Sequence, residues 1–451
     1  MNPALSAEPR LRPSEQSWRN ITVLPRPDRL SPTVRLTDYV DALDRLGQSP
    51  DEAISIYIHL PFCAVRCLYC GCNTTITHSS ERIDRYLDHL AQEMDLVVQR
   101  IGSDRDLLQL HFGGGTPNYL NDSQLVRLME MVSQRFRILG ETDSSIECHP
   151  RRASAGQLSL LRGLGFRRIS FGVQDLQPEV QRAIGRVQSL EMVEDVYGMA
   201  RDAGFEYINL DLIYGLPEQT LDSFGATLDA VIGLGPDRVS CYPYTHTPDL
   251  HPHQHAIDAA RLPSSLDRLA FFHRAVDRFA ESGYTWIGLD TFVLDTDELA
   301  IAQEEARLHL NGIGYTPAPT RHLMSFGLGG VTETGSLLVN SPCSMKDWQD
   351  AIGQRRLPMA QGRRLDPAQQ QRREAIIGLI CNLEIPIDLA ALGLPKEFAR
   401  VAQYAKDGLV QIDGDRLSLT DRGRYFVHAL CIDPQRHLRS DEALWPLLRN
   451  L

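Results

Sequence analysis

Four cysteines lie close together, at positions 63, 67, 70 and 72, and their spacing limits the chemistry they can do. Thiolates bind both zinc and iron–sulfur clusters. Structural zinc usually takes four protein ligands in two separated pairs, and no second Cys-x-x-Cys or His-x-His pair lies where it could complete such a site. A cubic iron–sulfur cluster held by three cysteines instead leaves one iron open to a small molecule. We therefore interpret the loop as a cluster site rather than as a disulfide or a set of buried thiols.

A glycine-rich turn, residues 111–117, directly follows a predicted strand and reads His-Phe-Gly-Gly-Gly-Thr-Pro. Glycine lets backbone N–H and C=O groups approach a ligand closely because no Cβ intervenes. An amino acid moiety on an open iron would offer an amine and a carboxylate, which suit such groups. Alone, this pattern is more often a tight turn, but beside the cysteine loop we favour the binding interpretation.

Polar residues also interrupt the apolar runs at the ends of later predicted strands or just after them: Glu147, Gln174, Arg186 and Asp211. Burying such a group unpaired costs about 1–3 kcal/mol. Neighbouring backbone could satisfy any one of them. Four at successive strand ends are better explained by a shared site, because the carboxyl ends of barrel strands meet at one mouth.

The elements that position these residues alternate between short β-rich runs and amphipathic helices from Ile54 to about Val293, which predicts a parallel α/β sheet. One clear helix between the first two runs carries Ile83, Leu87, Leu90, Met94 and Val97 on one face. The number of strands suits a partial (β/α)6 TIM-like barrel. The predicted strands are Ile54–His59, Leu107–Phe112, Ser144–His149, Arg168–Val173, Tyr207–Ile213, Arg238–Pro243 and Tyr284–Leu289.

Four regions follow from these patterns. We expect an N-terminal arm over residues 1–50 with a helix at 35–46, a barrel and substrate-pocket extension over 51–330, a connecting segment over 331–370, and a mainly helical C-terminal domain over 371–451. In the last region, residues 408–419 predict a hairpin, and Thr420 caps a final helix through Phe426 and Leu430, as in a winged helix. Four aspartates nearby disfavour DNA binding and favour a packing or lid role: Asp407, Asp413, Asp415 and Asp421.

Two further motifs receive structural interpretations. We take Gly327-Leu328-Gly329-Gly330 as a turn or as backbone of a substrate pocket. The scattered histidines 246, 251, 253 and 255 suggest a solvated loop rather than a metal site.

The whole chain has 451 residues, more than one core usually supports, and a formal charge of −12. That charge argues against a general nucleic-acid binder. The remaining cysteines are scattered singly, which suits a reducing compartment. Because no apolar run reaches the length of a membrane span or forms a signal peptide, we expect a cytoplasmic protein without membrane or nucleic-acid partners.

The cysteine loop, with Tyr69 just before its third cysteine, resembles the cluster loop of radical S-adenosylmethionine (SAM) enzymes. Its ending, Cys-Gly-Cys-Asn at 70–73, and its flank, Tyr-Ile-His-Leu-Pro-Phe at 57–62, are similar to the oxygen-independent coproporphyrinogen III oxidase (coproporphyrinogen dehydrogenase) family. The resemblance extends from about Ile54 to Cys431. It implies a [4Fe-4S] cluster on Cys63, Cys67 and Cys70, with SAM as the second cofactor.

The resemblance also assigns cofactor contacts. A glycine-rich strand end binds the methionine amino group in these enzymes, and other residues hold the ribose and the carboxylate. Tyr57 matches a contact to a second SAM, and Tyr69 the aromatic residue of the loop. The residues that match SAM contacts here are Gly114, Gly115, Thr116, Glu147, Gln174, Arg186 and Asp211.

The chain departs from the family on the substrate side. A Met-Asp-His-Phe run in the family is Leu-Asp-Thr-Phe at 289–292 here, a glutamine is Ile313, and Pro317 and Pro319 stiffen the following loop. No counterpart of an N-terminal Tyr-Thr-Ser-Tyr-Pro segment occurs within residues 20–40. Arg321 and His322 could supply replacement contacts to substrate carboxylates. We therefore expect robust SAM cleavage but slow or absent coproporphyrinogen turnover.

The implied activity is that of an oxidoreductase of porphyrin and haem biosynthesis, in which a 5′-deoxyadenosyl radical takes hydrogen from a propionate that becomes a vinyl group. The implied partners are a carboxylate-bearing substrate such as a porphyrinogen and an electron donor such as flavodoxin or ferredoxin. We expect a monomer. Two alternatives remain: a diverged paralogue acting as a radical SAM methyltransferase or decarboxylase, and a haem-binding chaperone, which Cys72 disfavours.

Serine replacement tests the cysteine assignment. We expect Cys63→Ser, Cys67→Ser and Cys70→Ser each to abolish iron binding after anaerobic reconstitution, because each removes one of three ligands. Cys72→Ser should keep its iron. Equal loss of iron from Cys72→Ser, measured by iron and sulfide content, would contradict the assignment.

Overall fold

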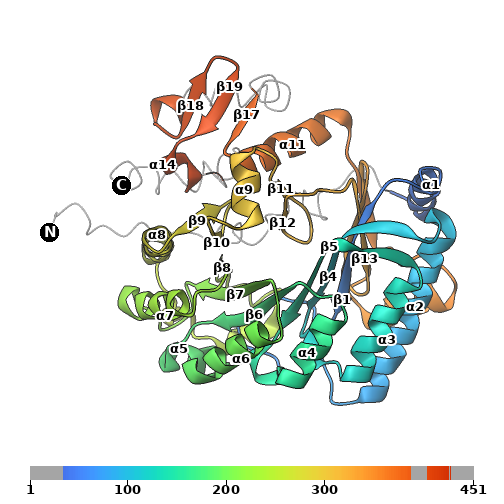
Figure 1. Ribbon diagram of the computed structural model, residues 1–451, viewed down its shortest axis with the longest axis horizontal. Helices are drawn as coiled ribbons and strands as arrows, with labels where there is room; N and C mark the ends of the chain where they lie inside the picture. Colours follow the sequence, from blue (N-terminus) through green and yellow to red (C-terminus); the bar gives the residue numbers. More distant parts are fainter. Residues whose placement is uncertain (1–33, 387–403, 426, 428–451) are drawn as a thin grey trace.

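The structure is a computed structural model that describes residues 34–386, 404–425 and 427. Parallel strands form its centre, with helices on the outside, and the predicted partial (β/α)6 barrel is confirmed (Figure 1). Within the described residues, six parallel strands lie side by side in chain order: β1 (Ile54–Leu60), β4 (Arg105–Gly114), β5 (Phe136–Cys148), β6 (Arg168–Gln174), β7 (Tyr207–Tyr214) and β8 (Arg238–Pro243). Each matches a predicted strand, although β5 begins at Phe136 rather than at Ser144.

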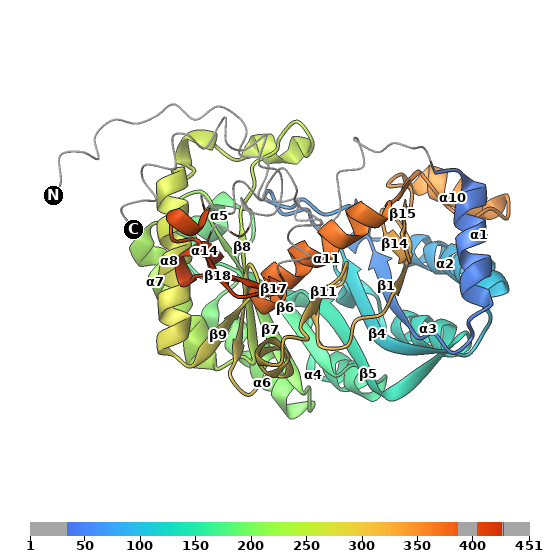
Figure 2. The same ribbon diagram turned by 90° about the horizontal axis from the view of Figure 1, so that it is seen from above.

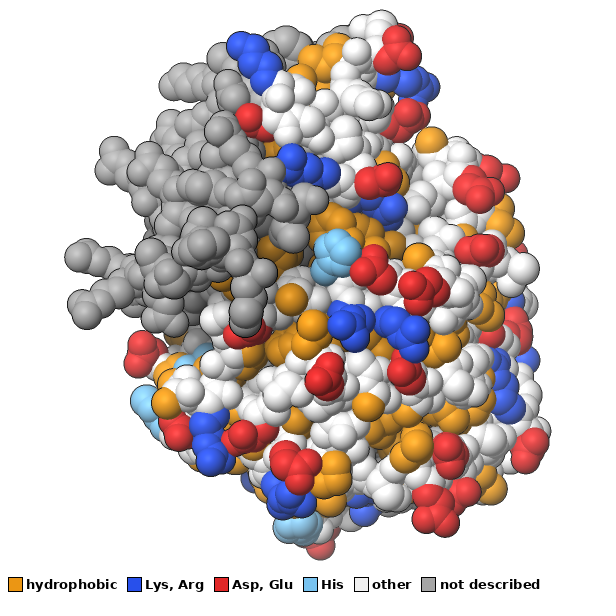
Figure 3. All heavy atoms as spheres, turned by 90° about the vertical axis from the view of Figure 1, so that its left-hand side faces the viewer, with side chains coloured by type: hydrophobic (Ala, Val, Ile, Leu, Met, Phe, Trp, Pro, Cys, Tyr) orange, Lys and Arg blue, Asp and Glu red, His pale blue; other side chains and the backbone are white. Residues whose placement is uncertain are grey.

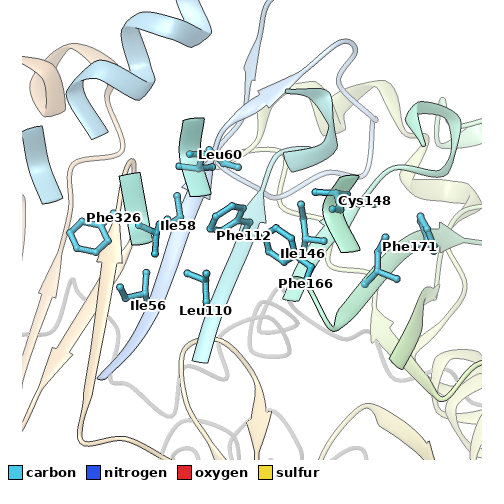
Figure 4. Close-up of a cluster of buried hydrophobic side chains, with 14 of the residues drawn as sticks. Ile56, Ile58, Leu60, Leu110, Phe112, Ile146, Cys148, Phe166, Phe171 and Phe326 are labelled. Carbon is cyan, nitrogen blue, oxygen red and sulfur yellow. The ribbon is translucent and has the colours of Figure 1, made fainter. Parts of the chain in front are cut away.

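The helices cover one face of the sheet. Apolar side chains on alternate strand positions, such as Ile56, Ile58, Phe112 and Ile146, point toward these helices and are buried (Figure 4). Serine, threonine or asparagine begins most of the helices by accepting an N–H bond at the N-cap, as Ser79 does for α2. The outer helices are α2 (Ser80–Ile101), α3 (Asp122–Ser133), α4 (Ala155–Gly163), α5 (Pro178–Ala183), α6 (Leu190–Asp202), α7 (Leu221–Leu234) and α8 (Ser265–Glu281).

The seventh predicted strand does not continue the parallel order. It forms β9 (Tyr284–Ile287), which pairs only with the antiparallel strand β10 (Thr291–Leu294), and β10 pairs in turn with β8. A short turn that includes Gly288, at φ +58°, joins the two. A turn this short can join only antiparallel strands, because a parallel partner needs a crossover of a dozen residues or more.

The segment 331–370, predicted to be a connector, is instead regular structure that extends the main sheet. Strand β13 (His322–Phe326) pairs parallel with β1, and three antiparallel strands follow it to the sheet edge. Their short length and the intervening turns hid them from a search for long periodic runs. The added elements are β14 (Val331–Thr334), β15 (Leu337–Asn340), α10 (Met345–Gly353) and β16 (Gln361–Arg364).

The predicted helix of the N-terminal arm is present as α1 (Leu36–Gly47) and lies near α2 and α10 at one end of the molecule (Figure 2). At the other end lie α7 and α8, and α11 (Pro367–Asn382) spans the side between them (Figure 2). Within the described residues no helix is long and apolar enough to cross a membrane. The remaining short elements are β2 (Phe62–Cys63), β3 (Thr75–Ile76), η4 (Pro117–Tyr119), η5 (Pro150–Arg152), η6 (Pro252–Ala256), η7 (Ala259–Arg261), α9 (Glu298–Glu304), β11 (His309–Leu310) and β12 (Tyr315–Thr316).

The C-terminal region contains the predicted hairpin. Strands β18 (Val410–Asp413) and β19 (Arg416–Leu419) pair antiparallel, and β17 (Glu384–Pro386) adds a third strand. Thr420 caps α14 (Asp421–Arg424) by accepting the N–H of Gly423. Phe426 and Leu430, predicted to continue this helix, lie outside the described residues.

A buried ion pair fastens the start of β8 to α9. Arg238 donates from Nε to Asp297 Oδ2 at 2.7 Å and pairs with Glu298 at 3.0 Å. Only 3% of the Arg238 side chain and 1% of the Asp297 side chain are exposed, against 37% for Glu298.

Truncating the two acids should therefore have unequal effects. We expect Asp297→Ala to lower the free energy of unfolding by about 3–5 kcal/mol, because it removes the buried partner of Arg238. Glu298→Ala should cost less than about 1 kcal/mol, because that carboxylate is solvated. Denaturant unfolding of both variants gives the comparison, and equal losses would contradict it.

Candidate active site at the barrel mouth

The inner face of the barrel is polar along its whole length. Because strand side chains alternate, the residues between the outer apolar positions point inward. Tyr57 lies beside His111, and His111 beside Ser145, in register across β1, β4 and β5. The inner residues that sequence reasoning missed are Ser55, Gln109, His111, Ser145, Arg168, Ser170 and Asn209. The alternation of polar and apolar residues along each strand is the sequence signal that identifies them, whereas the predicted site included only residues at the strand ends.

The cysteine loop leaves β1 and covers the carboxyl ends of the strands. Cys63, Cys67 and Cys70 are half-buried, and Cys72 is exposed. Cys63 Sγ lies 3.2 Å from Thr116 Oγ1, and Arg186 Nη1 lies 3.7 Å from Cys67 Sγ. The loop therefore contacts the glycine-rich turn on one side and the segment after α5 on the other.

The loop is held by an apolar anchor and by backbone hydrogen bonds. Tyr69 is buried in a cluster that includes Val180, Ile184 and Tyr244. Gln254 Nε2 donates to the Tyr69 carbonyl at 3.0 Å, and His253 Nε2 lies 2.7 Å from the Cys70 carbonyl oxygen. The histidine-containing segment predicted to be a solvated loop thus packs against the cysteine loop.

The glycine-rich turn brings backbone close to the loop and to an acid. A Cβ on Gly115 would lie 2.7 Å from the Pro61 carbonyl, so only glycine fits. Gly114 has φ +117° and donates its N–H to Glu147 Oε2 at 3.0 Å. Thr116 contacts Cys63, as described above. The three residues predicted from this turn therefore lie beside the first cysteine.

Glu147 occupies the mouth as an ionised acid. Burial alone would raise the pKa of its carboxyl, but the His111 hydrogen bond and charge and the Gly114 N–H hold it below its ordinary value. His111 Nε2 lies 3.3 Å from Glu147 Oε1, and the Tyr57 ring stacks on the His111 ring with centroids 5.8 Å apart. Since 43% of the Glu147 side chain is exposed, it can accept hydrogen bonds from a ligand.

Arg186 points at the cysteines from the opposite side. One guanidinium nitrogen donates to the Gly172 carbonyl and another to Cys67 Sγ. Its Nε is buried and has no hydrogen-bond partner among the described residues. Gln174 adopts φ +71° at the end of β6, and its amide lies close to Gly172. A buried donor without a partner is costly, which fits a ligand carboxylate at this position.

Asp211 lies deeper, within a network on the inner face. Ser170 Oγ donates to Asp211 Oδ2 at 2.9 Å, and Asn209 Nδ2 donates to Oδ1 at 2.7 Å. Burial raises the pKa of Asp211 to about 7. Hydrogen bonds from Ser170 and Asn209 oppose this shift. Both oxygens are already bonded, so a ligand hydroxyl would share an existing acceptor.

Helix α2 secures the glycine-containing loop 327–330 on the far side of the cysteine loop. Tyr86 donates its hydroxyl to the His59 carbonyl at 2.6 Å, and Glu93 accepts the Gly327 N–H at 2.8 Å and the Trp348 indole N–H at 3.1 Å. A Cβ on Gly327 would lie 2.8 Å from the His59 carbonyl. The motif is thus a tight turn against β1, as one of the two interpretations predicted.

The suggestion that Arg321 and His322 reach substrate carboxylates is wrong. His322 begins β13 beside the first residues of β1, at the amino ends of the barrel strands and away from the cysteines. Its ring nitrogens face Glu52 at 2.7 Å and Thr334 at 2.9 Å. Arg321 is exposed at the same end. Parallel pairing with β1 sets this position, and a sequence motif does not reveal it.

A cavity of about 270 Å³ lies behind the apolar anchor. Thr245, His246 and Arg268 line it, and the Thr245 hydroxyl is buried without a partner among the described residues. Sites for drug-sized ligands measure about 300–1,000 Å³, so this space suits a small polar group better than a tetrapyrrole.

The residues present fit the predicted cluster and SAM. Burial, and then repulsion from the neighbouring Cys70 and Cys67 thiolates, raise the pKa of the Cys63 thiol to about 11. A shared cationic cluster would relieve that repulsion. Among the described residues no three His, Cys, Asp or Glu side chains yet surround a single point as metal ligands. The ligand set therefore stays a prediction, supported by the donor chemistry and by the Arg186 Nε.

A model of the radical SAM superfamily matches residues 57–231, and a model of the HemN C-terminal domain matches residues 365–426. The chain is 37% identical over 413 residues to the oxygen-independent coproporphyrinogen III oxidase of Pseudomonas aeruginosa, covering 89% of this chain and 90% of that protein. Identity to the Escherichia coli K12 protein of that name is 36% over 407 residues, covering 88% of each. The solved coproporphyrinogen III oxidase of Escherichia coli, described as a radical SAM enzyme, superposes with a TM-score of 0.84 at 35% identity, covering 88% of this chain and 92% of that one.

Arg186→Ala should weaken SAM binding by about two orders of magnitude, since a charge-assisted pair is worth about 2–3 kcal/mol. Asp211→Asn should weaken it less, because the two existing donors can still bond one amide oxygen. Binding of SAM to the reconstituted protein measures both effects. Unchanged affinity in Arg186→Ala, or a protein that unfolds, would contradict a ligand role.

The buried acid Glu93 predicts a pH effect on stability. Burial raises its pKa from 4.5 to about 8, although the Gly327 and Trp348 N–H groups oppose the shift. The folded state then holds this proton more tightly than the unfolded state, so stability is fully present below pH 4.5 and is lost as pH rises toward 8. Glu93→Gln should shrink the fall in Tm between pH 5 and pH 8, whereas Glu81→Gln on the exposed first turn of α2 should not. An unchanged fall in Glu93→Gln would contradict this.

Proposed function

Because this chain belongs to the oxygen-independent coproporphyrinogen III oxidase family of radical SAM enzymes, we propose that it oxidatively decarboxylates two propionates of coproporphyrinogen III to vinyl groups. It is thus an oxidoreductase of porphyrin biosynthesis. The observation that carries the proposal is that one barrel mouth holds the cysteine loop, with Cys63 against Thr116 of the glycine-rich turn and Cys67 against Arg186, together with an ionised Glu147.

When bound, a [4Fe-4S] cluster would supply the electron for reductive cleavage of SAM to methionine and a 5′-deoxyadenosyl radical. The chain's own residues position these reactants. We propose that Cys63, Cys67 and Cys70 hold the iron, that Arg186 binds the methionine carboxylate through its Nε, and that carbonyls of the glycine-rich turn receive the amine. Tyr69, anchored in its apolar cluster, limits movement of the loop and entry of water.

The substrate step breaks a C–H bond and a C–C bond in each propionate. For each propionate, one hydrogen atom passes from the β-carbon to the 5′-deoxyadenosyl radical, which becomes 5′-deoxyadenosine. The bond between the α-carbon and the carboxylate carbon then breaks, CO2 leaves, one electron passes to an external acceptor, and a C=C bond forms between the α- and β-carbons. The polar inner face can solvate the carboxylates that remain. Ile313 and Thr291 stand where the family has other residues, and we propose that these two positions slow the turnover of coproporphyrinogen III.

We also propose how the enzyme works in the cell. It acts in the cytoplasm as a single copy and takes its electron from a small redox protein such as flavodoxin or ferredoxin. The short C-terminal sheet and α11 act by packing over the side of the barrel next to α9 and β11.

One anaerobic assay with a chemical reductant tests the proposal. We expect 5′-deoxyadenosine and protoporphyrinogen IX to form together from SAM and coproporphyrinogen III, with the porphyrinogen product forming more slowly than in relatives that keep the glutamine at position 313. Cleavage of SAM without any porphyrin product would exclude the oxidase reaction and favour a paralogue acting on another substrate. Haem binding without SAM cleavage would favour a chaperone.

A further inference from the structure

Exposed arginines surround the cysteine loop, although the chain as a whole has a formal charge of −12. On the face drawn in Figure 3, acidic and basic side chains are interspersed. Near the loop, four arginines are exposed, and one of them, Arg182, pairs with the exposed Glu179. We call this surface the arginine rim, and it comprises Arg66, Arg151, Arg152 and Arg182.

Side-chain and backbone contacts connect the rim to the cysteines on two sides. Arg151 donates its backbone N–H to His149 Nδ1 at 3.3 Å, and Arg152 stacks over the Tyr119 ring at 4.8 Å. The Tyr119 hydroxyl donates to the Thr77 carbonyl at 2.8 Å, directly after β3, which pairs with the strand that contains Cys63. These arginines therefore lie on the outer side of the first cysteine.

The second side runs through the segment after α5. Leu68 donates its N–H to the Ile184 carbonyl at 3.0 Å, which places the end of α5 against the loop between Cys67 and Cys70. Arg182 is exposed on this helix and pairs with Glu179 at 2.8 Å, so part of its charge is already balanced. Burial and then the charges of Arg186, Arg151 and Arg152 lower the pKa of His149 to about 2, in agreement with a cationic surface.

Apolar side chains lie within this rim. Val65 in the cysteine loop is 66% exposed, Val187 next to Arg186 is 57% exposed, and Ile76 beside Cys63 is 37% exposed. Exposed apolar residues with arginines around them are the composition of protein interfaces, in which arginine is enriched and lysine is depleted.

We propose that the arginine rim and its apolar centre are the docking surface for a small acidic electron-carrier protein that reduces the cluster. The inference rests on the proposed function, which needs electrons from outside the chain. One electron leaves the carrier and one enters the cluster, and no proton or other group moves. Electron-transfer complexes bury little surface area, so four arginines and three apolar side chains suit the docking surface of one.

Charge favours a protein with a local acidic patch over a nucleic acid. The net charge of −12 would repel a long polyanion over the rest of the surface, whereas a small acidic protein needs to meet only the rim. Opposite charges at the rim would orient that protein with its redox centre toward the cysteines and raise its association rate at low salt.

The test uses the reconstituted enzyme and purified flavodoxin, an acidic one-electron carrier. Arg151→Glu/Arg152→Glu reverses two adjacent charges of the rim. Its matched control, Arg355→Glu/Arg356→Glu, reverses two adjacent exposed arginines on the turn after α10. We measure the Kd of oxidised flavodoxin, and then SAM cleavage driven by reduced flavodoxin and by dithionite.

The rim variant should weaken flavodoxin binding by tenfold or more and lower flavodoxin-driven cleavage to match, with dithionite-driven cleavage unchanged. The control should bind like wild type. If the rim variant loses iron, Arg182→Glu provides the same test on the other side. Unchanged flavodoxin binding in both variants, an equal loss in the control, or tighter binding of a single-stranded RNA than of flavodoxin would overturn the proposal. Failure of wild type to cleave SAM with dithionite would instead overturn the proposed function.

Discussion

The alternation of side chains along six parallel strands is the constraint on which this structure depends. Helices cover one face and bury its apolar residues, as Ile58, Phe112 and Ile146 show (Figure 4). The other face carries the polar residues, because successive side chains of a strand point to opposite faces. Hydrogen-bonded side chains such as Asp211 and Glu147 can therefore stand inside a chamber without the cost of unpaired burial.

The cysteine loop directly follows strand β1 of that barrel and is held in place by three separate contacts. Tyr69 anchors it in an apolar cluster, Arg186 approaches Cys67, and the turn at Gly115 lies too close to Pro61 for any other residue. These contacts come from different parts of the barrel: the apolar cluster around Tyr69, the segment after α5 and the turn after β4. A loop held in this way can present three sulfurs to one cluster, and small shifts of β1, β4 or β6 would move them apart.

The inside and the outside of the barrel mouth differ in their charged groups. Inside the mouth, hydrogen bonds and the charge of His111 lower the pKa of Glu147. Burial raises the pKa of Asp211 to about 7. Outside, four exposed arginines lie near the loop of a chain whose formal net charge is −12. The inner groups suit a zwitterionic small molecule, and the outer ones suit a macromolecule that never enters the chamber.

The sequence by itself determined those structural features that depend on residues close together in the chain. The spacing of Cys63, Cys67 and Cys70, the glycine-rich turn and the six parallel strands follow from local pattern, and local pattern sets ligand reach and strand alternation. The hairpin at β18 and β19 and the cap at Thr420 were predictable for the same reason.

Only the tertiary structure decided which distant segments meet. Pairing of β13 with β1 placed His322 at the amino end of the barrel and recruited residues 331–370 into the sheet. The segment with His253 and Gln254 contacts the cysteine loop across more than 180 positions of the chain. Such contacts depend on how sheet edges and loops close in space. Sequence periodicity does not show which strands or loops will meet, because each segment has the same short-range pattern whichever partner it packs against.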